Sequence, residues 1–179
     1  MPGPVFLHNE TVELRTVETD DLKFVQEQVN DPDVWGMLGM SAPKNRHDEE
    51  EWLDSLTGDD DTVNLLVCDD GTPVGLMGLH VDETWGVGEL GYWVAPDAQG
   101  NGYCTAAVRL MSTYAFEERR LHKVVAEAYE HNSGSQRVLE KVGFTQEGVH
   151  REEAFVGGTY RDLLHYGLLA DELSSVSSS

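Results

Sequence analysis

The sequence predicts a single α+β domain, and three observations support this class. A chain of 179 residues with 40% hydrophobic content is long enough to bury one core. Three strand-like segments follow one another between residues 63 and 94, which is typical of an antiparallel meander. Two helical patterns come later, over residues 102–120 and 133–141. We expect one domain over residues 1–173 and a flexible, Ser-rich tail over residues 174–179.

The first third of the chain is predicted to begin with a strand and to continue as a helix. Residues 5–17 alternate loosely in hydrophobicity, which favours a strand, and Thr19 or Asp20 can cap a helix that runs to Val29. The Asn-Asp-Pro sequence that follows ends this helix. A loop containing Gly and Met should continue through residue 43, before a short helix over residues 47–57.

The central segment is predicted to form three antiparallel strands. They span residues 63–68, 73–81 and 84–94, and short acidic turns separate them. The apolar residues of the pattern over 102–120 fall on one face, so this segment should be a long helix.

The C-terminal third is predicted to alternate between strands and a helix. A strand over residues 123–129 leads to a helix that starts at residue 133 or 134 and stops before Gly143. Strands over residues 144–150 and 160–169 complete the domain.

The charge of the chain is strongly negative. Thirty-three acidic residues against twelve basic ones give a net charge of -21. The acidic residues are scattered among apolar positions, which indicates a solvated surface and predicts a halophilic cytoplasm, where salt screens the self-repulsion. Attraction of a basic substrate, a basic protein tail or a polyamine is the alternative. Because clustered lysines and arginines are absent, nucleic acid is disfavoured as a partner.

The two cysteines and the N-terminus predict a reduced, cytoplasmic protein. Cys68 and Cys104 lack the spacing of a zinc site or a disulfide framework, so both thiols should be free. The first residues do not form a signal peptide, and no run approaches 18 apolar residues. We therefore expect no metal and no membrane contact.

The join between the strand ending at Val94 and the helix beginning near Gly102 is the most informative segment. Glycines 100 and 102 let successive backbone N–H groups point at one anion, while the helix N-terminus adds a positive dipole end. A dinucleotide fingerprint would need a third glycine where Thr105 stands, and the Gly-Lys-Ser/Thr of a nucleotide phosphate loop is missing. A tight turn without a ligand remains the alternative.

Three runs of sequence carry a resemblance to a known family. They are Glu89 to Pro96, Gln99 to Ala107 and Asn132 to Phe144. In order and spacing they resemble the GNAT superfamily of N-acetyltransferases, and the closest branch is that of the RimJ/RimL-like ribosomal-protein-serine/alanine acetyltransferases. The resemblance implies a mixed, mostly antiparallel central sheet of six to seven strands, splayed between the fourth and fifth, with about four helices.

The resemblance also implies an acetyl-CoA site. The family's pyrophosphate loop maps to Gln99 through Cys104, where cysteine replaces the usual Gly or Ala, for packing or for chemistry. The strand ending at Val94 should carry a bulge that frees backbone groups for the pantetheine arm. The residues implied to bind the cofactor are Trp93, Val94, Gln99, Gly100, Asn101, Gly102, Tyr103, Cys104, Thr105, Asn132 and Ser135.

The resemblance further implies direct attack of an amine on the thioester in a ternary complex. Glu89 is the first candidate for a water-linked base, and its alternative is one acidic surface residue among many. Many members place a proton-donating tyrosine where Leu139 stands here, so Ser135 is the best partner for the departing thiolate. A hydrogen bond in the first turn of a helix is the alternative role for Ser135.

The acceptor amine is less well defined by the sequence. An α-amino group has a lower pKa than lysine and needs less help from a base, which favours a protein N-terminus. A polyamine or antibiotic amine, a non-catalytic acetyl-CoA sensor and a protein that uses only the fold for an interaction are the alternatives. The acceptor pocket is expected between Trp35 and Trp52 and around Tyr160, in a monomer or a homodimer.

Overall fold

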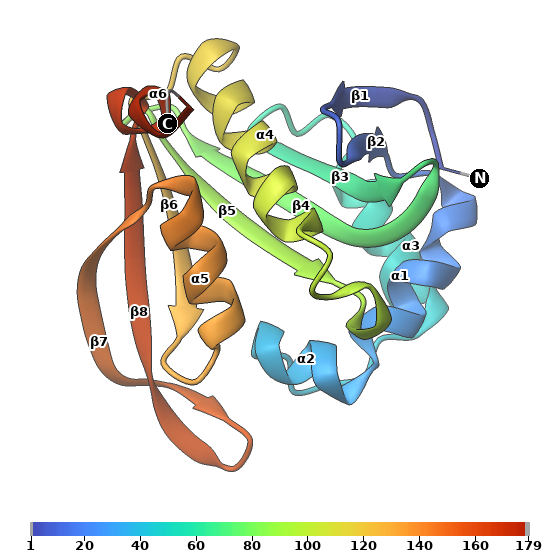
Figure 1. Ribbon diagram of the computed structural model, residues 1–179. Helices are drawn as coiled ribbons and strands as arrows, with labels where there is room; N and C mark the ends of the chain where they lie inside the picture. Colours follow the sequence, from blue (N-terminus) through green and yellow to red (C-terminus); the bar gives the residue numbers. More distant parts are fainter. Residues whose placement is uncertain (1, 178–179) are drawn as a thin grey trace.

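One eight-stranded sheet organises the chain in the computed structural model, which describes residues 2–177 (Figure 1). Each strand is antiparallel to its neighbours, except that β5 and β6 run parallel. The prediction of a mixed, mostly antiparallel sheet is therefore confirmed. Across the sheet the strands are β1 (Val5–His8), β2 (Glu13–Thr16), β3 (Thr62–Asp69), β4 (Thr72–Asp82), β5 (Val87–Val94), β6 (Lys123–Tyr129), β8 (Thr159–Leu169) and β7 (Thr145–Val156).

The sheet has more strands than the six to seven that we predicted. The segment expected as one strand over residues 5–17 is a hairpin of β1 and β2. Asn9 forms its turn, because the Oδ1 atom accepts hydrogen bonds from the N–H groups of Thr11 and Val12, each at 2.9 Å. Asparagine side chains that bond to the backbone two residues on are a common way to make such a turn.

The described residues also contain more helices than the four that we predicted. Pro32 begins a helix where a loop was expected, with the Asp31 side chain capping it and Gly39 ending it at a φ of 68°. The last helix reaches into the predicted tail, whose residues 178–179 lie outside the described part of the chain. None of these helices is long and apolar enough to cross a membrane. The helices are α1 (Leu22–Val29), α2 (Pro32–Leu38), α3 (Arg46–Ser55), α4 (Tyr103–Glu117), α5 (Ser133–Val142) and α6 (Ala170–Ser177).

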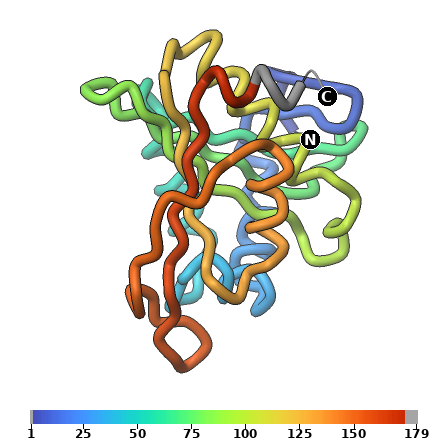
Figure 2. Tube along the Cα trace, turned by 60° about the vertical axis from the view of Figure 1, so that its left-hand side comes forward, coloured from blue at the N-terminus to red at the C-terminus, as the bar shows by residue number. Residues whose placement is uncertain are grey.

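Two layers of helices cover different parts of the sheet (Figure 1). The larger core lies under α4 and α5 and includes Met111 of α4, Leu139 of α5 and Tyr166 of β8. A smaller core around Val25 and Trp93 joins α1 and α2 to β3, β4 and β5 on the opposite face. The hairpin of β7 and β8 extends beyond the rest of the chain, as Figures 1 and 2 both show.

The parallel strands β5 and β6 separate partway along their length. β5 pairs with β6 only from Val87 to Leu90, whereas it pairs with β4 up to Val94. These strands are the fourth and fifth of the predicted sheet, so the predicted splay is confirmed. The expected bulge is not, because the pairing of β5 with β4 keeps one register throughout. Divergence from β6, and not an inserted residue, frees the backbone from Gly91 onward.

Candidate active site

The loop between β5 and α4 presents free backbone N–H groups. Gly100 and Gly102 have φ values of 81° and 80°, in the left-handed region that favours glycine. Gly102 caps α4 without a side-chain bond, and its carbonyl accepts the N–H of Ala106 at 3.0 Å. This is the first hydrogen bond of the helix, so the N–H groups of Tyr103, Cys104 and Thr105 have no acceptor within it. The loop therefore has the geometry of an anion site.

Side chains within the loop hold its shape. Gln99 Nε2 donates to the carbonyl oxygen of Val94 at 3.2 Å, and Asn101 Nδ2 donates to that of Ala98 at 2.9 Å. The Tyr103 hydroxyl donates to the Asp69 carboxylate at 2.5 Å, which raises the tyrosine pKa. Because these side chains bond to the protein, the backbone of the loop is the part left for a ligand.

The backbone of Val94 faces the gap between β5 and β6. The N–H of the next residue, Ala95, donates to Val74 of β4 at 2.8 Å. Since the polar groups of successive strand residues point to opposite sides, those of Val94 point away from β4. The backbone N–H and C=O of Trp93 point toward β4. The Trp93 carbonyl oxygen lies so close to Gly75 of β4 that a Cβ at residue 75 would collide with it. The structure thus leaves Val94, and not Trp93, with a backbone donor in the gap.

Two hydroxyl groups meet across the gap. The Tyr92 hydroxyl on β5 lies 2.8 Å from Oγ of Ser135 at the start of α5. Asn132 caps this helix, and its Oδ1 accepts the N–H of Ser135 at 3.1 Å. Burial raises the pKa of Tyr92, so its phenol stays protonated and can donate. Sequence reasoning did not single out Tyr92, although strand alternation places it on the same face as buried Leu90.

Cys104 lies in the first turn of α4, near this pair. Burial raises its pKa to about 12, and the cysteine adds to the rise in the pKa of Tyr92. A thiol with so high a pKa holds little of the reactive thiolate at neutral pH. The geometry therefore supports packing as the role of Cys104.

Glu89 lies on the other face of β5. Strand alternation places its exposed side chain on the face of Trp93, whose ring packs 5.8 Å from that of Phe24 in α1. The structure does not bring Glu89 and Ser135 together on one face. Both can approach a single ligand only where β5 and β6 have separated, beyond Leu90.

The segments expected to form the acceptor pocket divide into three places. Trp35 lines a cavity of about 220 Å³ between the end of α1 and the loop before α3. Trp52 packs against the smaller core, and Tyr160 is exposed on the β7–β8 hairpin, 5.1 Å from the ring of Phe155. A Cβ added to Gly39, which ends α2, would collide with the Tyr129 hydroxyl at the end of β6, so the α2 segment reaches across the mouth of the gap.

The face of the sheet that carries Glu89 is acidic along β5 and β6. Glu89 of β5 and Glu127 of β6 point to the same side, because Glu89 pairs with Val125 and side chains two residues apart share a face. Exposed Glu130 follows at the end of β6, where Arg161 Nη1 lies 3.8 Å from its carboxylate. A cationic amine would be attracted to this surface.

Comparison with known proteins places the chain in a family. Residues 11–145 match the model of the acetyltransferase (GNAT) domain. The Bacillus subtilis (strain 168) protein named "Putative ribosomal N-acetyltransferase YdaF" is 41% identical over 104 residues, which are 58% of this chain and 57% of YdaF. The chain thus matches little more than half the length of that relative.

Two solved structures share nearly the whole fold. Vibrio cholerae spermidine N-acetyltransferase, in complex with CoA and spermine, superposes with a TM-score of 0.87 at 24% identity, over 93% of this chain and 99% of that one. Mycobacterium smegmatis RimJ, in complex with CoA-disulfide, gives 0.83 at 24% identity, over 96% and 88%. The domain match covers most of the chain, and this protein belongs to the GNAT acetyltransferase family.

Proposed function

We propose that this protein is an acetyl-CoA-dependent N-acetyltransferase that transfers the acetyl group to a primary amine. The observation that carries the proposal is the gap between β5 and β6 beyond Leu90, which opens beside the free N–H groups at the start of α4. Family membership supports the same activity, and the spermidine acetyltransferase and RimJ structures of this fold contain CoA and CoA-disulfide, respectively.

The donor is proposed to lie along the loop and into the gap. The N–H groups of residues 102–105 bind the pyrophosphate, because they combine a left-handed N-cap with the positive end of the α4 dipole. Gln99 and Asn101 act by holding this loop in place. The pantetheine arm follows the freed edge of β5 toward Asn132, which puts the thioester between the two strands.

The chemistry follows from the groups around the gap. The neutral amine attacks the thioester carbon, and the N–H of Val94 stabilises the oxyanion that forms. When the C–S bond breaks, the Tyr92–Ser135 pair supplies a proton to the thiolate. Glu89 takes the proton of the amine through water from the opposite face of β5. The proton of the amine is therefore taken up on one face of β5, and the proton for the thiolate is supplied from the other face.

The acceptor is proposed to be the α-amino group of a protein N-terminus. YdaF, which is named as a ribosomal N-acetyltransferase, is 41% identical to this chain over 104 residues. An α-amine has a pKa of about 7.7 to 8.0, so an exposed base such as Glu89 suffices to deprotonate it. A polyamine is the second candidate, since Glu89, Glu127 and Glu130 provide spaced negative charges and the spermidine acetyltransferase shares the fold.

A substrate panel tests the proposal. The protein is incubated in molar KCl with acetyl-CoA and three acceptors: a Ser- or Ala-starting peptide, the same peptide with a blocked N-terminus, and spermidine. Mass spectrometry should find acetylation of the free N-terminus and none of the blocked peptide. Acetylation of spermidine alone would favour the second candidate, whereas acetyl-CoA binding without any product would identify a sensor and overturn the proposed activity.

A further inference from the structure

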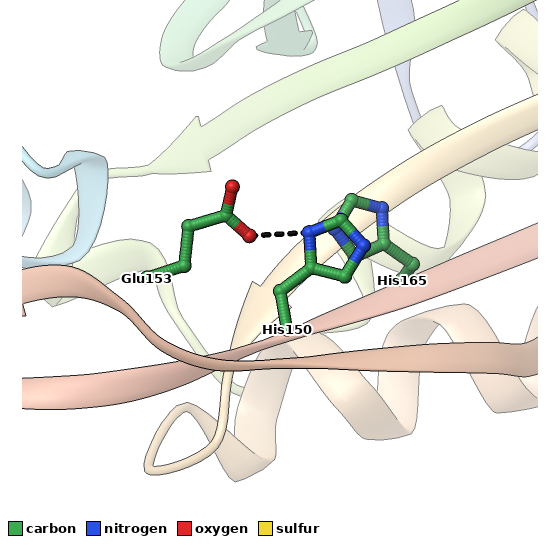
Figure 3. Close-up of side chains that lie close together, drawn as sticks. All are labelled: His150, Glu153 and His165. Carbon is green, nitrogen blue, oxygen red and sulfur yellow. Dashed lines mark hydrogen bonds and ion pairs between the residues drawn. The ribbon is translucent and has the colours of Figure 1, made fainter.

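A cluster of His150, Glu153 and His165 lies on β7 and β8, and the proposed chemistry does not use it (Figure 3). His165 pairs with Glu127 of β6, so the cluster lies on the face of the sheet that carries Glu89, opposite α4 and α5. The two imidazole rings have centroids 3.8 Å apart and are inclined by 36°. The Glu153 carboxylate contacts Nδ1 of His150. One ligand atom from each residue can be chosen so that all three lie within 4.8 Å of one another.

His165 is the best-defined member of the cluster. Its Nδ1 atom lies 3.3 Å from Oε1 of Glu127 on the neighbouring strand β6. Its Nε2 atom is buried and has no hydrogen-bond partner among the described residues. Histidines that bind metals commonly have one ring nitrogen on a carboxylate and the other directed at the ion. Leaving a buried ring nitrogen without a partner costs free energy, so the unpartnered Nε2 atom of His165 indicates that a ligand binds there.

An irregular part of β7 brings the other two residues together. In a regular strand, residues three apart point to opposite faces, and His150 and Glu153 would be separated. Here the register shifts between His150 and Ala154, because three residues of β7 lie opposite Asp162 alone. Glu152 takes a left-handed φ of 50°, and its N–H donates to Oδ1 of Asp162 at 2.8 Å. The bulge thus turns the Glu153 side chain back to His150.

The position opposite His165 makes room for the second ring. Gly148 of β7 pairs with His165, and it has no side chain to fill the space beside the imidazole. His150, two residues further along β7, is the diagonal neighbour of His165 and is near enough for its ring to lean over. His150 thus lies between two register shifts in β7, one at residues 146–148 and one at residues 150–154.

We propose that His150, Glu153 and His165 bind a divalent transition metal ion, with zinc as the ion to test. Two imidazoles and one carboxylate form a donor set that zinc accepts, with a fourth position for water. In a tetrahedral site the ligand atoms lie about 3.4 Å apart. Because the three ligand atoms here lie within 4.8 Å of one another, the most widely separated pair must close by at most about 1.4 Å. The side chains of His150 and Glu153 are 52% and 50% exposed and are free to make this adjustment. Glu127 orients His165.

Calorimetric titration of Zn²⁺ into the full-length, tag-free protein tests the site without acetyl-CoA, so its result is independent of the proposed enzyme activity. We expect one ion per chain. His150→Ala, His165→Ala and Glu153→Gln should each weaken binding at least tenfold, and Glu127→Gln should weaken it about tenfold by loosening His165. The control is His47→Ala on α3, which removes an exposed histidine 3.2 Å from the Glu51 carboxylate and should change nothing.

Two further readouts separate loss of the site from loss of folding. Circular dichroism of the metal-free variants should match that of the wild type, and Co²⁺ should give a visible absorption band in the wild type that His165→Ala abolishes. The proposal is overturned by the absence of saturable Zn²⁺ binding, by binding that survives both histidine substitutions, or by an equal loss in His47→Ala.

Discussion

Removing either hydroxyl of the Tyr92–Ser135 pair should slow turnover far more than it destabilises the fold. The two oxygens lie 2.8 Å apart, so Tyr92→Phe or Ser135→Ala removes one hydrogen bond, which contributes about 0.5–1.5 kcal/mol to stability. A positioned proton donor is worth about 10²- to 10⁴-fold in rate, or roughly 3 to 5 kcal/mol of activation free energy. The loss in kcat should therefore exceed the loss in folding free energy.

A double-mutant cycle tests whether the two hydroxyls act as one unit. Release of CoA thiol gives kcat and KM for the wild type, the two single variants and the double variant, and urea unfolding gives their stabilities. If the pair acts together, the double variant is no slower than the slower single variant. Tyr114→Phe is the control, since Tyr114 is another tyrosine with its ring against Phe6 of β1, and it should keep the wild-type kcat.

The pH profile adds a second readout of the same pair. Because burial raises the pKa of Tyr92 above the ordinary value of 10.0, the phenol stays protonated through that pH. As long as the protein stays folded at pH 10, its kcat should therefore show no loss from tyrosine ionisation at that pH. Losses of kcat that multiply in the double variant, or a single variant with full turnover, would refute the proton-donor role.

Gly102→Ala strains a φ of 80° and should cost about 1–2 kcal/mol in urea unfolding and raise KM for acetyl-CoA, whereas Gly148→Ala, which has open space and an ordinary φ, should leave KM unchanged. Cys104, whose pKa is about 12, should react with iodoacetamide roughly 10³-fold more slowly at pH 8 than a free cysteine. Its reaction rate should rise about tenfold per pH unit up to pH 11. Equal labelling of Cys104 in native and urea-unfolded protein would contradict this. Glu89→Gln should lower kcat by about 10²-fold with KM for acetyl-CoA nearly constant, since the residue lies on the face away from Tyr92, and an unchanged kcat would remove it as the base. The net charge of -21 should make the thermal midpoint rise continuously from dilute buffer to molar KCl, and a midpoint independent of salt would argue against the halophilic interpretation.

The parts of the fold predicted best are those whose signals are local. Strands β3 to β5 were predicted within about three residues because short acidic turns bound them. The hairpin of β1 and β2 was missed because its turn depends on the Asn9 side chain. The helix α2 was missed because Pro32 was interpreted as a helix breaker, although proline is equally suited to the first position of a helix.

The parts of the candidate site that the sequence predicts are likewise those with local signals. The loop over residues 99–104 could be predicted because its glycines and the helix N-terminus are contiguous. The partnership of Tyr92 with Ser135 joins residues 43 apart and depends on how far β5 and β6 separate, which no local pattern records. Strand alternation could have shown that Glu89 and Tyr92 lie on opposite faces. The cluster around His165 depends on two register shifts in β7, which only the paired strands reveal.

In the proposed mechanism, the backbone of residues 102–105 and the N–H of Val94 hold acetyl-CoA beside the β5–β6 gap. Amide NMR of labelled protein titrated with acetyl-CoA in molar KCl tests it most directly. We expect the largest shifts on these amides and smaller shifts at Asn132 and Ser135. Saturable binding whose shifts fall instead on the cavity near Trp35, or no shifts at all, would contradict it.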